Sequence, residues 1–197
     1  MTKNRQTKAV PVAALAGNPN VGKSTIFNAL TGMRQHTGNW PGKTVSLAQG
    51  VCVYKGEEIR LVDLPGTYAL VSKSQEETLA AGFISGGEAD CVIAVCDATS
   101  LERSLILALQ VMELTDRVIV CVNLMDEAQK QGIEIDLAAL SFELGVPVVA
   151  ASASREEGMG ELLEQLRRIL DGFEAPRPRR CGVVPNSIRE SHLGAEA

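Results

Sequence analysis

The sequence predicts an α/β fold: an open, mostly parallel six-stranded sheet with one antiparallel edge strand and helices on both faces. Three observations predict it. Six apolar, β-branched runs alternate with helical patterns, a short turn at residues 55–57 joins the second and third runs, and a glycine-rich loop follows the first. Such alternation is typical of a parallel sheet covered by helices on both faces.

The six expected strands are residues 9–17, 44–54, 57–66, 90–99, 117–126 and 146–153. The later runs, such as CVIAVC and VIVCVN, are continuously apolar, so we expect them to be buried on both faces of the sheet. The turn at residues 55–57 is short enough for a hairpin, which makes one strand antiparallel.

The five expected helices are residues 23–30, 75–83, 101–114, 136–144 and 159–170, each with apolar residues at i, i+3 and i+4. After Leu170 the composition changes to prolines, charges and glycines without a periodic apolar face. We therefore expect one domain over residues 1–171 and a linker or disordered tail over residues 172–197. The PRPRR piece would also suit a docking motif.

The composition limits the partners of the chain. Its formal net charge is −5 and its body has no run of Lys or Arg, so neither nucleic acid nor an anionic membrane surface is expected. No stretch approaches the roughly 20 apolar residues that span a bilayer. The basic N-terminus and its brief apolar run also suit a signal peptide, but that run ends in the glycine loop. Five cysteines without a CxxC pair favour a reducing, cytoplasmic location.

A phosphate-binding motif lies between the first expected strand and the first expected helix. The pattern GxxxxGK[ST] is matched by Gly17, Asn18, Pro19, Asn20, Val21, Gly22, Lys23 and Ser24, and Thr25 follows it. The two glycines let backbone N–H groups and the helix N-terminus approach a phosphate. Lys23 supplies positive charge to the β- and γ-phosphates, and the Ser24 hydroxyl is an oxygen ligand for Mg²⁺.

Two further motifs follow later strands. Asp63 and Gly66 belong to DLPG, where the carboxylate is expected to hold Mg²⁺ through water and the Gly66 N–H to contact the γ-phosphate. The tetrad NLMD, Asn123 to Asp126 with Leu124 inside it, ends the fifth expected strand. A carboxylate there accepts two hydrogen bonds from guanine N1–H and the 2-amino group, which adenine does not offer.

The dipeptide Ser152-Ala153, at the end of the last expected strand, would complete the base pocket with a backbone N–H to guanine O6. These four motifs resemble the translation-factor-related branch of small GTPases, and more closely the N-terminal G domain of the ferrous-iron transport protein B family. The resemblance is carried over roughly residues 10–170 by GNPNVGKSTIFNALTG, TGNWPGKTV, DLPGTYAL, DATSLERSLILALQVMEL, NLMDEAQKQGIEID and LGVPVVAASA. It implies a Ras-like P-loop GTPase fold.

The resemblance also implies roles for single residues. Thr44, with Gly42 and Lys43 before it, would be the first-switch threonine that reaches Mg²⁺ and the γ-phosphate, so Ser24, Thr44 and Asp63 are the expected metal ligands.

The family's potassium-stimulated members carry an asparagine at the position of Asn20, so Lys23, Thr44 and Asn20 are the expected catalytic residues, with K⁺ as an added cofactor. Thr67 stands where Ras-like proteins have a water-orienting glutamine, which predicts slow hydrolysis. Leu124 replaces the lysine of the common NKxD form, and AAGF at residues 80–83 lacks charges expected after SQEE.

The predicted function is GTP binding with slow, Mg²⁺-dependent hydrolysis, regulating a ferrous iron transport system. The family continues into a helical bundle and a membrane permease, so we expect an excised domain or a truncated relative acting at the cytosolic face of the bacterial inner membrane. Two alternatives stay open: a GTP/GDP-sensing module with negligible turnover, and a GTPase of ribosome assembly or tRNA modification.

Overall fold

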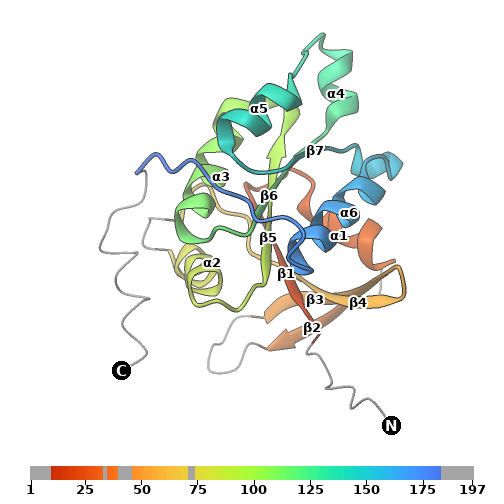
Figure 1. Ribbon diagram of the computed structural model, residues 1–197, viewed down its shortest axis with the longest axis vertical. Helices are drawn as coiled ribbons and strands as arrows, with labels where there is room; N and C mark the ends of the chain where they lie inside the picture. Colours follow the sequence, from red (N-terminus) through yellow and green to blue (C-terminus); the bar gives the residue numbers. More distant parts are fainter. Residues whose placement is uncertain (1–9, 33–34, 40–45, 71–73, 183–197) are drawn as a thin grey trace.

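A computed structural model of the chain describes residues 10–32, 35–39, 46–70 and 74–182, with residues 35–39 and 46 described by their backbone alone. In this part of the chain one seven-stranded sheet has the order β2-β3-β4-β1-β5-β6-β7 (Figure 1). The strands are β1 (Val12–Gly17), β2 (Gln35–Asn39), β3 (Ser46–Tyr54), β4 (Glu57–Asp63), β5 (Cys91–Asp97), β6 (Val118–Asn123) and β7 (Val148–Ala150). β3 runs antiparallel to both β2 and β4, and the other pairs are parallel.

The α/β architecture predicted from the sequence is confirmed, since the six expected strands are present as β1 and β3 to β7. The structure adds β2 outside β3, so the antiparallel edge of the described sheet contains two strands. The segment QHTGN of β2 has no apolar alternation, and for that reason periodicity did not indicate it.

The hairpin between β3 and β4 follows from its two turn residues. Lys55 has a φ of 51° and Gly56 a φ of 84°, both in the left-handed region. Two consecutive positive φ values are the requirement of a type I′ turn, whose twist matches that of the paired strands. The two residues therefore hold β3 and β4 in register from Tyr54 opposite Glu57 up to Ala48 opposite Asp63.

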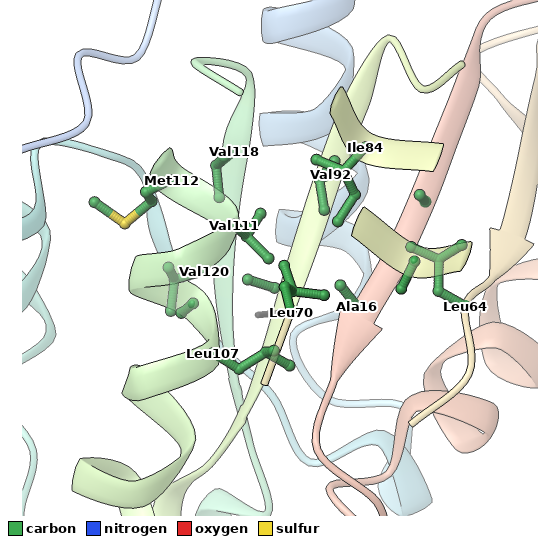
Figure 2. Close-up of a cluster of buried hydrophobic side chains, with 14 of the residues drawn as sticks. Ala16, Leu64, Leu70, Ile84, Val92, Leu107, Val111, Met112, Val118 and Val120 are labelled. Atoms are coloured by element: carbon green, nitrogen blue, oxygen red, sulfur yellow. The ribbon is translucent and has the colours of Figure 1, made fainter. Parts of the chain in front are cut away.

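Six α-helices are described: α1 (Lys23–Thr31), α2 (Gln75–Ser85), α3 (Leu101–Leu114), α4 (Met125–Lys130), α5 (Leu137–Leu144) and α6 (Met159–Leu170). α2 and α3 pack on one face of the sheet, where Leu107, Val111 and Ile84 meet Val92 and Val120 of the strands (Figure 2). α1 and α6 cover the other face through side chains that include Ile26, Phe27, Leu162 and Leu166. None of the helices in the described residues is long and apolar enough to cross a membrane.

The residues after α6 return across the surface to the ends of α5 and α3 (Figure 1). Residues 177–182, here named the C-terminal strap, contribute backbone N–H groups of Arg177 and Arg179 to the carbonyls of Gly145 and Leu144, at 3.0 and 2.9 Å. The Arg180 guanidinium donates to the Met112 carbonyl at 3.1 Å. Carbonyls at helix C-termini lack hydrogen-bond donors within their own helix, and the strap supplies donors to these carbonyls.

Candidate nucleotide-binding site

The topology brings the sequence motifs to one edge of the sheet. The phosphate loop, DLPG and NLMD begin at the last residues of β1, β4 and β6, and Ser152-Ala153 follows β7. Because these four strands are parallel, their carboxyl ends lie on the same side, where ligands bind in open α/β sheets. A cavity of about 480 Å³ lies at the opposite end of the sheet, at the amino ends of the strands. It is lined by Glu57 and Asp90 among others and contains no residue of these motifs.

The phosphate loop adopts a backbone that its glycines permit. Gly22 has a φ of 86° and precedes the first turn of α1, and a side chain there would collide with the Asn123 amide. A Cβ on Gly17 would lie 2.7 Å from the carbonyl oxygen of Val95. Asn20 is also left-handed, with a φ of 66°, and is exposed. With this backbone the loop leads directly into the N-terminus of α1, a position at which proteins commonly bind anions.

Three chemically different side chains meet where the loop enters α1. Lys23 is buried, and burial lowers the pKa of its ammonium group, an effect that the Asp63 carboxylate opposes. The Ser24 hydroxyl donates to Asp63 Oδ2 at 3.1 Å. Burial raises the pKa of Asp63, while Lys23 and the Ser24 hydrogen bond lower it.

Asp63 Oδ1 and Asn18 Oδ1 are buried and have no hydrogen-bond partner within the part of the chain that the structure describes. Buried polar atoms are normally paired, and these two oxygens at the phosphate loop have the capacity to bind a ligand. Among the described residues, no group of three or more His, Cys, Asp or Glu side chains is placed so that it could hold a metal ion by itself. The hydroxyl and carboxylate of Ser24 and Asp63 fit a hydrated Mg²⁺ that takes further oxygens from a bound phosphate.

The DLPG segment packs directly against the phosphate loop. A Cβ on Gly66 would lie 3.2 Å from Lys23 Nζ and equally close to the Pro19 backbone, so only glycine fits without displacing them. The Thr67 N–H donates to the Gly17 carbonyl at 3.3 Å. The backbone N–H of Leu70 donates to Gln110 Oε1 of α3 at 2.6 Å, a contact that the sequence motifs do not indicate.

Asn123 joins the phosphate loop to the expected base pocket. Its amide nitrogen donates to the Val21 carbonyl at 3.0 Å, and its amide oxygen accepts from the Ala153 N–H at 3.0 Å. The side chain is 1% exposed, so both bonds are shielded from water. Asn123 is thus a bridge between two loops.

Asp126 faces the pocket from the first turn of α4. The preceding Leu124 is left-handed, with a φ of 63°, and the Asp126 N–H donates to Ser152 Oγ at 3.2 Å. Asp126 Oδ1 is buried without a hydrogen-bond partner among the described residues, and Oδ2 lies 3.4 Å from Arg155 Nε. A cavity of about 340 Å³ is lined by Asp126, Ser152 and Arg155 among others. One free carboxylate oxygen here suits a ligand with N–H donors.

Comparison with known proteins agrees with this arrangement. A family model described as "Ferrous iron transport protein B" matches residues 11–166. The chain belongs to this family. The resemblance noted in the sequence is therefore confirmed.

The alignments with relatives in this family include most of this chain but only a small part of each full-length relative. The Fe(2+) transporter FeoB of Escherichia coli (strain K12) is 44% identical over 165 residues, which are 82% of this chain and 21% of the relative. The chain thus spans about a fifth of the length of the curated relatives it matches. The crystal structure of the G domain of the T. maritima FeoB iron transporter is 45% identical, with a TM-score of 0.76, and the match covers 81% of this chain and 98% of that one.

The cytosolic domain of the T. maritima FeoB iron transporter in its GMPPNP form is 43% identical with a TM-score of 0.79, covering 87% of this chain and 67% of that one. Within this FeoB-family chain, the expected switch residues Gly42, Lys43 and Thr44 lie outside the described residues. The structure brings the remaining expected residues to one sheet edge. It adds two that sequence reasoning missed, Gln110 and Arg155, because their partners are distant in sequence or in another loop.

Proposed function

We propose that this chain binds GTP and GDP and hydrolyses GTP slowly, with Mg²⁺, as the regulatory G domain of a ferrous iron transport system. The observation that supports this most directly is the arrangement, among the described residues, of one buried ammonium group and two unpartnered carboxylate oxygens at one sheet edge. The Lys23 ammonium group and an unpartnered Asp63 oxygen lie at the phosphate loop, and an unpartnered Asp126 oxygen lies at the base pocket. A guanine nucleotide presents phosphates at one end and N–H donors at the other.

At the phosphate end, Lys23 would neutralise charge on the β- and γ-phosphates, and N–H groups of the loop would donate to the same oxygens. Ser24, Asp63 and Thr44 are the proposed ligands of Mg²⁺. When bound, the ion would stabilise the negative charge that grows between the β- and γ-phosphates during hydrolysis. At the base end, Asp126 would accept the guanine N1–H and 2-amino hydrogens. The Ala153 N–H, which the sequence assigned to O6, donates to Asn123 Oδ1 in this structure, so O6 would have to share that donor.

The proposed hydrolysis is slow because the chain lacks a water-orienting glutamine after DLPG. Thr67 occupies that position, is buried, and uses its N–H on the Gly17 carbonyl. A short buried side chain cannot hold an attacking water as an exposed glutamine does. The same observation leaves a second candidate, a module that senses GTP and GDP with negligible turnover.

A monovalent cation would offset the missing glutamine. Asn20 lies exposed on the phosphate loop in a left-handed conformation, so its amide oxygen is accessible for K⁺. Carbonyl-type oxygens suit K⁺ when their spacing matches its radius. We therefore include potassium stimulation in the proposal.

Turnover of GTP at matched ionic strength in potassium and in sodium tests these points, with wild type, Asn20→Ala, and EDTA as the control for Mg²⁺. The proposal expects slow turnover that EDTA abolishes, faster rates in potassium, and loss of that difference in Asn20→Ala with GDP affinity retained. Equal rates in both salts would remove the cation from the proposal. Tight GTP binding without turnover in either salt would select the sensing module.

The transport role rests on the family. The curated relatives are Fe(2+) transporters, and the T. maritima structures are described as a cytosolic domain of an iron transporter. We propose that the chain works with a membrane permease, in the same polypeptide or as a separate protein, at the cytosolic face of the membrane. Loss of ferrous iron uptake in cells expressing Lys23→Ala in place of wild type is the expected result.

A further inference from the structure

The carboxylate that the proposed function assigns to the guanine base already has a partner. Arg155 Nε lies 3.4 Å from Asp126 Oδ2. The Asp126 side chain is 8% exposed and that of Arg155 is 50% exposed, so the pair crosses from the buried wall of the pocket to solvent. Arg155 ends η2 (Ala153–Arg155), the turn that also carries the backbone N–H expected at guanine O6.

The two oxygens of Asp126 differ in their surroundings. Oδ2 faces the guanidinium of Arg155, whereas Oδ1 is buried and has no hydrogen-bond partner in the described part of the chain. Two acidic side chains, Glu134 and Glu157, line the same cavity of about 340 Å³, but Asp126 is the acid within ion-pair distance of Arg155 among the described residues. Guanine needs both Asp126 oxygens, since it donates from N1–H and from its 2-amino group.

We propose that Arg155 competes with guanine for Asp126 and thereby determines how tightly the pocket holds nucleotides that need both carboxylate oxygens. This inference rests on the proposed function, in which Asp126 recognises the base. When guanine enters, Arg155 releases Oδ2, and the free energy of the ion pair is subtracted from the binding free energy. A partly exposed pair changes an equilibrium by about two- to fivefold.

Inosine separates this competition from every other effect of Arg155. Inosine diphosphate has the N1–H of guanine and lacks the 2-amino group, so it needs one Asp126 oxygen and can use the free Oδ1. GDP and IDP carry identical phosphates, so the loss of a positive charge at position 155 changes their long-range attraction to the protein equally. The ratio of their affinities therefore reports on competition for Oδ2 alone.

The experiment measures GDP and IDP dissociation constants by calorimetry for wild type, Arg155→Met and Arg168→Met. Methionine keeps a long apolar stem and removes the charge. Arg168 is the matched control because it is 51% exposed and forms its ion pair with Glu174, not with a residue of the base pocket.

In Arg155→Met, GDP affinity should rise about two- to fivefold relative to IDP affinity, and Arg168→Met should keep the wild-type ratio. An unchanged or lower ratio in Arg155→Met, with GDP bound normally by wild type, would overturn the competition while leaving the proposed function intact. Failure of wild type to bind either nucleotide would overturn the proposed function and this inference together.

Discussion

Truncating Asn123 should weaken the fold by an amount that its hydrogen bonds define. The Asn123→Ala change removes the bonds to the Val21 carbonyl and from the Ala153 N–H, both 3.0 Å long. Val21 and Ala153 are 3% and 4% exposed, so water does not easily replace the lost amide. Leaving one buried polar group unsatisfied costs about 1–3 kcal/mol, and two such groups should lower the free energy of unfolding by about 2–6 kcal/mol.

Urea denaturation without nucleotide measures this loss, and Ser152→Ala is its control. Ser152 is 3% exposed and its Oγ accepts one hydrogen bond, from the Asp126 N–H at 3.2 Å. Ser152→Ala leaves one buried group unpaired instead of two. It should therefore lower the free energy of unfolding by about half as much as Asn123→Ala, with the same m value, the slope of that free energy against urea concentration. A loss below about 1 kcal/mol for Asn123→Ala, or a larger loss for Ser152→Ala, would refute the bridging role.

Four further outcomes are expected. Lys23→Ala should lower GTP and GDP affinity in calorimetry about ten- to hundredfold with the fold retained, because it removes charge-assisted hydrogen bonds to phosphate. Asp126→Asn should prefer XTP to GTP in competition binding, since an amide offers a donor to the 2-carbonyl of xanthine. Arg180→Ala should lower the free energy of unfolding in urea by about 1 kcal/mol, because its guanidinium donates to a carbonyl at the end of α3. Burial raises the pKa of Cys52 from 9.0 to about 11. The folded thiol therefore keeps its proton while the unfolded one loses it, and chemical denaturation should show stability falling between about pH 9 and 11, less so in Cys52→Ala.

Periodicity predicted the large elements of the fold because each buries a regular apolar face. It missed β2, whose QHTGN sequence has no alternation, and α4, which is six residues long and largely polar. Hydrophobic periodicity also did not predict the contacts of the C-terminal strap. They include backbone hydrogen bonds to the end of α5, and the Arg179 guanidinium lies 4.7 Å from the centre of the Phe142 ring. Neither kind of contact leaves a repeating pattern in the sequence.

The candidate site was predictable where a motif combines strand, loop and helix in a fixed order. The sequence located the residues of the phosphate loop, DLPG and NLMD, but it could not say which polar groups pair with one another. Asn123 was expected among the nucleotide contacts. The structure shows that its amide group also links two loops, through hydrogen bonds to the Val21 carbonyl and from the Ala153 N–H. Gln110 and Arg155 belong to no motif, and their importance depends on partners 40 and 29 positions away, respectively, that only the fold brings near.

The phosphate loop and the base pocket form one structural unit, and the reason lies in the contact between Gly22 and Asn123. Gly22 has no side chain, and the Asn123 amide occupies the space that a Cβ would need. The same amide holds the Val21 carbonyl on one side and the Ala153 N–H on the other. We therefore expect a shift of the loop that carries Ala153 to displace the turn that opens α1, and a shift of that turn to displace the loop. Contacts to the base and contacts to the phosphates share this link, so their contributions to nucleotide affinity should not be additive when one residue from each loop is changed together.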